Sequence, residues 1–156
     1  MNMKFKKLAA CLMATASLAT GMVGMSASAA NTEDTAYSYG VDLDQWLGSQ
    51  HTDGREKTNS TSVYVRLDTI GKRVKTQTEG SYSPYNYCTN HTSRTTVTIT
   101  NGSWEVYNDI YESLIEQYHY NNAYARLKMW AADSSSTGNV MGMWSPDTAG
   151  SYPVAR

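Results

Sequence analysis

Short stretches of this chain alternate apolar and polar residues, which is the period of a half-buried β-strand. The clearest stretch is 61–70, where Val63, Val65 and Leu67 alternate with polar neighbours. Residues 123–131 repeat the pattern, with Leu127 and Met129 on the apolar side. The same reasoning predicts further strands at 37–43, 73–80, 94–102 and 140–144, about six in all.

One segment has a different period. From Trp104 to Tyr118 the apolar residues recur every three or four positions, and Ser103 is suited to cap a helix that begins there. The sequence therefore predicts a mainly β (α+β) fold, a small antiparallel sheet or sandwich of about six strands with one helix near 103–118. A purely β-sandwich is the alternative, because the first half of this segment also alternates like a strand.

The turns between these segments suggest local pairing. Gly71 and Lys72 offer a turn between the second and third strands, and residues 133–139, rich in serine, precede the final strand. Both are typical of β-hairpins. Residues 48–60 and 79–94 carry glycine, proline and other turn formers, so we expect loops there.

Aromatic residues must supply much of the core. The only phenylalanine is Phe5, whereas all twelve tyrosines and all four tryptophans follow residue 36. Each buried tyrosine or tryptophan contributes roughly 150–250 Å² of apolar surface. Sixteen such side chains are enough to stabilise one small domain in spite of the sparse aliphatic residues.

The first thirty residues have the pattern of a secretory signal peptide. Three lysines precede an uncharged run from Leu8 to Met25, and small residues follow it. We expect cleavage after Ala29 or Ala30, a flexible mature N-terminus at 31–36, and a single secreted, extracellular β-rich domain at 37–156. An uncleaved membrane anchor and lipidation of Cys11 are alternatives. A lipidated cysteine lies after the apolar run of its leader, however, whereas Cys11 precedes most of that run.

The net charge and the cysteine content limit the kinds of partner that this chain can bind. Without the three lysines of the leader, ten basic residues remain against fourteen acidic ones, a net charge of about −4. This excludes a basic surface for nucleic acid and gives no reason to expect membrane binding after the leader is removed. Cys88 is then the only cysteine, so it is buried, free, or joined by an intermolecular disulfide in a homodimer.

The candidate binding residues are Tyr82, Tyr85 and Tyr87, which crowd the predicted loop at 79–94. Each ring offers a flat apolar face and a polar edge, as binding surfaces require. We therefore expect a secreted, non-enzymatic binding protein whose ligand is a cell-wall polymer or another protein. The alternative is that these rings fill a core that lacks phenylalanine.

Signs of catalysis or metal binding are weak. Cys88 and His91 lie three residues apart, which suggests a thiol-dependent hydrolase only if the fold adds an orienting group. Asp42 and Asp44, with His51 and Asp53, contain oxygen and nitrogen donors but lack the spacing of a calcium loop. We expect no catalytic residues, no metal and no cofactor.

The C-terminal residues carry a resemblance. The stretch 138–153, together with 61–67 and 122–127, resembles a group of short, secreted, uncharacterised proteins of Gram-positive bacteria. The resemblance implies secretion and a compact β-rich domain, with no catalytic residues. Size, leader and tyrosine- and glycine-rich composition also resemble the lactococcin-type bacteriocins, so an antimicrobial protein is a second functional hypothesis. The shared ending has the form G-x-V-x-G-x-W-S-P-D-[S/T], here Gly138, Val140, Gly142, Trp144, Ser145, Pro146, Asp147 and Thr148.

Overall fold

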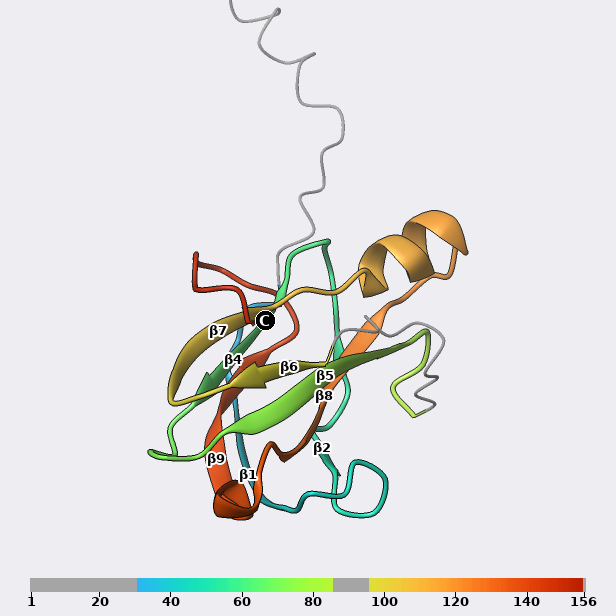
Figure 1. The fold of residues 1–156 in the computed structure, drawn as a ribbon. Helices are drawn as coiled ribbons and strands as arrows, with labels where there is room; N and C mark the ends of the chain where they lie inside the picture. The colour runs from blue at the N-terminus through green and yellow to red at the C-terminus, as the bar shows by residue number, and fades with distance from the viewer. Residues whose placement is uncertain (1–30, 86–95, 156) are drawn as a thin grey trace, which may run out of the picture.

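The computed structural model describes residues 31–85 and 96–155. Two antiparallel sheets pack face to face, as Figure 1 shows. The four-stranded sheet, sheet A, has the order β1 (Thr35–Val41), β9 (Gly138–Ser145), β4 (Val63–Leu67) and β7 (Gly102–Val106). The five-stranded sheet, sheet B, has the order β2 (Gln50–His51), β8 (Tyr124–Ala131), β5 (Val74–Ser81) and β6 (Val97–Ile99), and β3 (Arg55–Glu56) also pairs with β8. The mainly β fold is thereby confirmed.

The core lies between the two sheets and follows the alternation in the sequence. In β4, Val63, Val65 and Leu67 are fully buried, and Leu127 and Met129 of β8 belong to the same core cluster from the other sheet. Trp144 is the largest of the fully buried side chains. Several tyrosines remain at the surface, so the aliphatic residues contribute more to this core than the composition suggested.

Gly142 permits the closest approach within sheet A. It pairs with Tyr37 of β1 on one side and with Leu67 of β4 on the other. The Tyr37 hydroxyl passes over this position and donates to the carbonyl oxygen of Arg66 at 2.9 Å. A Cβ atom on residue 142 would lie 1.8 Å from that oxygen. Only glycine fits here.

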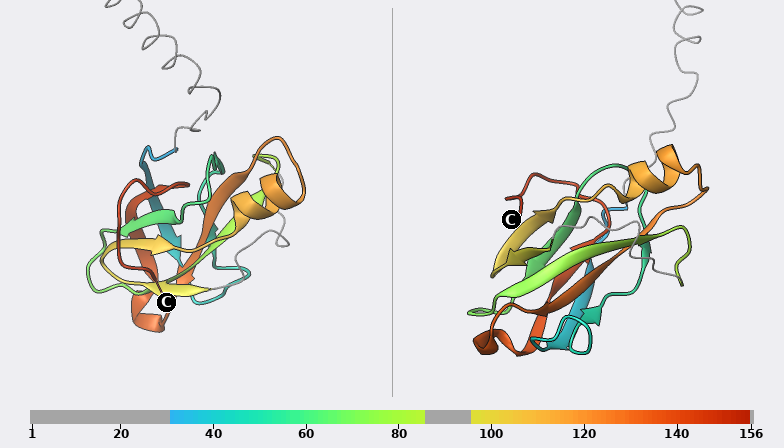
Figure 2. Two further views of the ribbon diagram at one scale, coloured as in Figure 1. Left: turned by 90° about the horizontal axis from the view of Figure 1, so that it is seen from above. Right: turned by 45° about the vertical axis from the view of Figure 1, so that its right-hand side comes forward.

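The predicted helix at 103–118 is only partly correct. Its first part is strand β7, and the helical turn η2 covers only Glu112–Gln117. Gly102 has a positive φ of 127°, which starts a strand in register with β4 and buries Val106. Pairing along β4 therefore overrides the helical spacing of the aromatic residues. In Figure 2 the helical turn lies at one end of the sandwich, outside both sheets.

The two predicted hairpins are wrong, because their turns carry the chain from one sheet to the other. The turn after β4 leads to β5 in sheet B, and the segment after β8 leads to β9 in sheet A through the helical turn η3 (Ser134–Ser136). These two connections lie together, since Lys72 donates to the carbonyl oxygens of Ser135 and Thr137. Turn residues indicate where the chain reverses direction. They do not indicate which strand the next segment pairs with.

At the start of the described chain, Thr35 begins β1 and the backbone nitrogen of Asn31 donates to Asp147. Two smaller expectations change. The loop expected at 48–60 contains the short strands β2 and β3. The first strand ends at Val41, and Leu43 is exposed. None of the helices among residues 31–85 and 96–155 has the length and apolar character needed to cross a membrane.

Candidate functional site

A group of exposed tyrosines lies at one end of sheet B. Tyr82 follows β5 directly, and Tyr120 precedes β8, which is the strand that pairs with β5. Their rings stack with centroids 4.7 Å apart and an angle of 19° between the planes. Tyr118 lies against Tyr120 at 6.4 Å. We call Tyr82, Tyr118 and Tyr120 the tyrosine platform.

The platform is open to solvent although its rings touch one another. Tyr82 is 49% exposed, Tyr118 53% and Tyr120 39%, and Tyr85, three residues beyond Tyr82, is 89% exposed. Two of the three predicted binding residues, Tyr82 and Tyr85, are therefore surface residues, and the core alternative does not apply to them. Tyr87 lies outside the described residues, as do Cys88 and His91. Tyr118 and Tyr120 crowd a separate turn in the sequence, and the fold brings them to Tyr82.

Stacked, exposed tyrosines combine two kinds of contact. The ring face is apolar and flat, and the hydroxyl at its edge donates and accepts hydrogen bonds. A ring held by a neighbouring ring also loses little conformational freedom when a ligand covers it. Such a surface suits a flat ligand that is apolar on its face and rich in hydroxyl groups at its edge.

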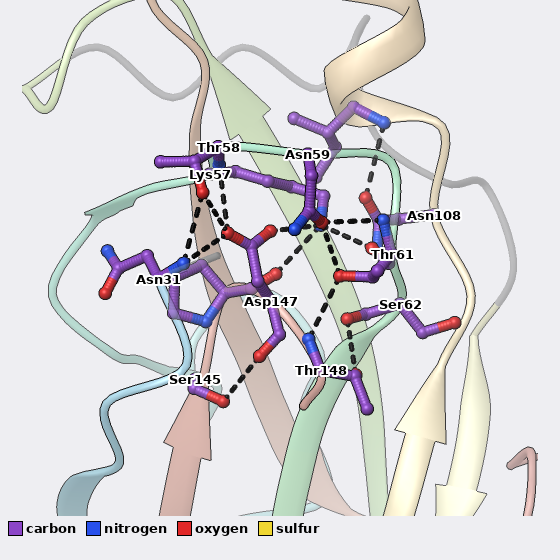
Figure 3. A network of polar contacts seen from close by, with 12 residues as sticks. Asn31, Lys57, Thr58, Asn59, Thr61, Ser62, Asn108, Ser145, Asp147 and Thr148 are labelled. Atoms are coloured by element: carbon purple, nitrogen blue, oxygen red, sulfur yellow. Dashed lines mark hydrogen bonds and ion pairs between the residues drawn. The ribbon is translucent and has the colours of Figure 1, made fainter. Parts of the chain in front are cut away.

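A second group of residues forms a buried polar network around the turn after β9, drawn in Figure 3. Lys57 Nζ lies 3.0 Å from Asp147 Oδ1, and neither side chain is exposed. The same ammonium group donates to the carbonyl oxygens of Thr61 and Pro146. Burial lowers the pKa of Lys57, and the neighbouring carboxylate of Asp147 opposes that shift.

The other oxygen of Asp147 is equally engaged. Asp147 Oδ2 accepts from the backbone N–H of Thr58 at 3.0 Å, from the Thr58 hydroxyl at 2.7 Å and from the backbone nitrogen of Asn31 at 2.8 Å. Hydrogen bonds to a charged oxygen are stronger than those between neutral groups. Asp147 thus ties the turn after β9 to the segment after β3 and to the start of the described chain.

The residues beside Asp147 complete the turn. The Ser145 hydroxyl donates to the carbonyl oxygen of Asp147 at 2.8 Å. Thr148 donates from its backbone to the Thr61 hydroxyl at 3.0 Å and from its hydroxyl to the carbonyl oxygen of Ser62 at 2.6 Å. The sequence W-S-P-D-T therefore forms a turn that connects β9 to the segment after β3. The role of Asp147 as partner of a buried lysine was not foreseen.

A third cluster lies on the outer face of sheet B. Glu79 Oε2 lies 2.6 Å from Arg126 Nη2 and 3.6 Å from His51 Nε2. Burial lowers the pKa of His51, Arg126 and Lys128 lower it further, and Glu79 raises it. Lys128 in turn lies 4.9 Å from the ring of Trp46, a cation–π contact. These contacts join β2, β5 and β8 on this face of the sheet.

The metal-binding residues considered from the sequence do not come together. Asp44 accepts from the backbone N–H groups of Trp46 and Leu47, and Asp42 accepts from that of Leu43, so both stabilise a turn. His51 belongs to the cluster with Glu79. Within the described part of the chain, no three histidine, cysteine or acidic side chains are grouped as a metal would require.

The fold and the site together define a small antiparallel β-sandwich with an exposed tyrosine platform and a buried lysine–aspartate joint. The chain belongs to the family described as "Protein of unknown function (DUF2712)", whose model matches residues 25–148. No curated protein and no solved structure matches the chain. The family description names no activity, so function has to be argued from the residues.

Proposed function

We propose that this chain is an exported, non-enzymatic binding protein that uses the tyrosine platform to hold an uncharged polysaccharide of the cell envelope. The single observation that carries this is the stacked pair of Tyr82 and Tyr120, two exposed rings from separate segments held at 4.7 Å. Export rests on the leader pattern of residues 1–30. The ending shared with short secreted proteins of Gram-positive bacteria supports the same compartment.

The chemistry of the platform favours a glycan. A sugar ring presents axial hydrogens on one face and hydroxyl groups around its edge, which matches the apolar face and polar edge of tyrosine. The acidic balance of about −4 after leader removal disfavours anionic polymers, because like charges repel. Repeated units along a polymer would compensate for the weak binding of a small surface through multivalency.

Retention on purified material tests the proposal. Protein that starts at Asn31 is incubated with purified cell walls and with neutral polysaccharides, and the bound fraction is measured. We expect retention that falls at least about tenfold when both Tyr82 and Tyr120 are changed to Ala, the loss expected of a central contact. Tyr107→Ala is the matched control, since Tyr107 is 65% exposed and lies outside the platform.

Two results would reject this function. One is no retention of the wild-type protein on any of the materials. The other is equal retention of the wild-type protein and the double variant, which would leave the platform without a role. Tyr85→Ala and Tyr87→Ala extend the series into the predicted loop.

An antimicrobial role is the second candidate. The small size, the leader pattern and the tyrosine- and glycine-rich composition, which resemble those of the lactococcin-type bacteriocins, support it. A killing assay with the purified protein on related bacteria distinguishes it from passive binding. Growth inhibition that survives the loss of the platform would favour this second function over the first.

The thiol of Cys88 defines two further alternatives. An intermolecular disulfide predicts a dimer that dissociates with reductant, and a thiol-dependent hydrolase predicts an activity that Cys88→Ser abolishes. Electrophoresis with and without reductant, and the same binding assay on Cys88→Ser, address both. Unchanged binding by a monomeric Cys88→Ser protein would show that the thiol has no role in the function.

A further inference from the structure

The backbone nitrogen of Asn31 lies in a site with two strong acceptors. It is 2.8 Å from Asp147 Oδ2 and 3.1 Å from the hydroxyl oxygen of Thr58. Figure 3 shows this nitrogen pointing into the network around Asp147. Asp147 is fully buried, so the contact is made at the edge of the core rather than in bulk solvent.

These two acceptors can take more hydrogen bonds than a peptide nitrogen can donate. A peptide N–H has one hydrogen, which must be shared here between a carboxylate and a hydroxyl. An α-ammonium group has three hydrogens and a full positive charge, so it would give each acceptor its own charge-assisted hydrogen bond. The site is therefore better matched to a free amino terminus than to a residue inside a chain.

The side chain of Asn31 is held as well. Its Nδ2 donates to the carbonyl oxygen of Glu56 at 2.8 Å, and its Oδ1 accepts from Arg55 Nη2 at 2.8 Å. Both partners belong to β3, which the pairing with β8 fixes. This residue is thus positioned by three segments: β3, Thr58 and the turn after β9.

We propose that cleavage between Ala30 and Asn31 creates an α-ammonium group that binds Asp147 and completes the fold. In this step a peptidase adds water across the Ala30–Asn31 peptide bond, and the products are a carboxylate on Ala30 and an ammonium group on Asn31. Cleavage after Ala30 is one of the two positions that the leader allows, and the geometry selects it over cleavage after Ala29. The inference rests on removal of the leader, which is part of the proposed function, and is independent of the tyrosine platform.

The charges around the site permit the additional cation. Lys57 occupies the opposite carboxylate oxygen, Oδ1, and Arg55 lies on the side-chain amide of Asn31. Asp147 is the acidic side chain in direct contact, at 2.8 Å. Asn31 is only half-buried, so water screens the repulsion from Arg55. The direct contact with the carboxylate therefore dominates.

The arrangement would link processing to stability. A chain that crosses a membrane through a protein channel travels unfolded, and an unprocessed chain lacks the ammonium contact. Full stability would then be reached only after the leader is removed. The signature is a pH dependence that the unprocessed form lacks.

The test compares three forms of the protein: one that starts at Asn31, the same form acetylated on its α-amino group, and one that retains Ala29 and Ala30. An α-amino group has an ordinary pKa of about 8. Contact with Asp147 raises the folded-state pKa, so the stabilisation is present below about pH 8 and is lost as pH rises through the folded-state value. At pH 6.5 we expect the unfolding equilibrium constant of the first form to be at least about tenfold smaller than that of the other two, with the difference shrinking above pH 9.

A second measurement needs no unfolding experiment. The α-amino pKa of the form starting at Asn31 is followed by NMR and compared with that of the form starting at Ala29. A higher value in the first form supports the proposal. Equal pKa values, equal pH dependence of unfolding in all three forms, or an exported protein whose first residue is Ala30 would each overturn it. Wall binding is measured on the same forms, so a failure here is distinguishable from a failure of the proposed function.

Discussion

Lys57 Nζ and Asp147 Oδ1 lie 3.0 Å apart with both side chains fully buried, and this pair joins two segments ninety positions apart in the chain. Such pairs are retained only when every remaining donor and acceptor is satisfied. Here Lys57 has two backbone carbonyl partners, and Asp147 Oδ2 has Thr58 and Asn31. The pair therefore fixes how the end of β9 meets the segment after β3.

Removing one member of this pair should be severe. Lys57→Met leaves the carboxylate of Asp147 buried without its cation, and we expect the free energy of unfolding to fall by about 3–5 kcal/mol. Urea denaturation measures it. Lys75→Met, a half-buried lysine on the outer face of sheet B, is the control and should change stability by about 0.5 kcal/mol or less.

A double variant tests whether the two side chains of this pair act on each other directly. The double variant Lys57→Met with Asp147→Asn should lose less stability than the sum of the two single losses, because the second change relieves the unpaired charge. Additive losses would contradict the direct coupling of the two side chains.

Gly142 gives a steric prediction. A Cβ atom there would lie 1.8 Å from the carbonyl oxygen of Arg66, in the middle of sheet A. We expect Gly142→Ala to destabilise the protein by more than about 3 kcal/mol, since the strands would have to separate.

Gly40 is the matched control for that change. It lies in the neighbouring strand β1, and its Cβ position meets only Asn139 Oδ1 at 3.6 Å, an ordinary contact. Gly40→Ala should alter stability by less than about 1 kcal/mol. Similar losses in the two variants would show that the sheet does not pack closely at Gly142.

His51 gives a pH prediction. Burial lowers its folded-state pKa, so the unfolded chain binds more protons than the folded protein just below pH 6.5. Stability should therefore decrease as pH falls through the unfolded value of about 6.5. His51→Gln lacks this proton uptake, and its stability should fall less between pH 7 and pH 5. Denaturation curves at both pH values measure the difference.

The neighbours of His51 set the direction of its shift. Glu79 raises its pKa, whereas Arg126 and Lys128 lower it. Glu79→Gln should therefore lower the NMR-measured pKa of His51, and Lys128→Met should raise it. Shifts in the same direction in both variants would contradict this electrostatic account.

The platform should contribute more to binding than to folding. Tyr120→Ala removes a stacked but exposed ring, so we expect a loss of only about 0.5–1.5 kcal/mol in stability. Thermal denaturation checks this. A much larger loss would mean that reduced wall retention of the variant reflects unfolding.

The strands were predictable wherever one face is buried. Val63, Val65 and Leu67 in β4 and Leu127 and Met129 in β8 show the two-residue period because sheet packing imposes it locally. The helix was predicted too long because Trp104 fits both periods, with Tyr107 at helical spacing and Val106 at strand spacing. The deciding contact, pairing of β7 with β4, joins residues about forty positions apart. Both hairpins failed for the same reason: a turn residue such as Gly71 reverses the chain without specifying which sheet receives it.

The candidate site was predictable only in part. Tyr82 and Tyr85 were identified because exposed aromatic residues in a loop suggest binding, but Tyr120 joins Tyr82 only through the pairing of β5 with β8. The ion pair of Lys57 and Asp147 produces no local pattern in the sequence, because a buried charged residue cannot be distinguished there from an exposed one. The turn formers around Asp147 indicate a turn but give no sign of the buried lysine.

NMR titration with soluble fragments of an uncharged wall polysaccharide, following the ring signals of the tyrosines, tests the role of the platform most directly. The account predicts that the signals of Tyr82, Tyr118 and Tyr120 shift together and saturate, while that of Tyr107 stays in place. Shifts confined to residues outside the platform, or no shifts at all with fragments and intact walls alike, would contradict it.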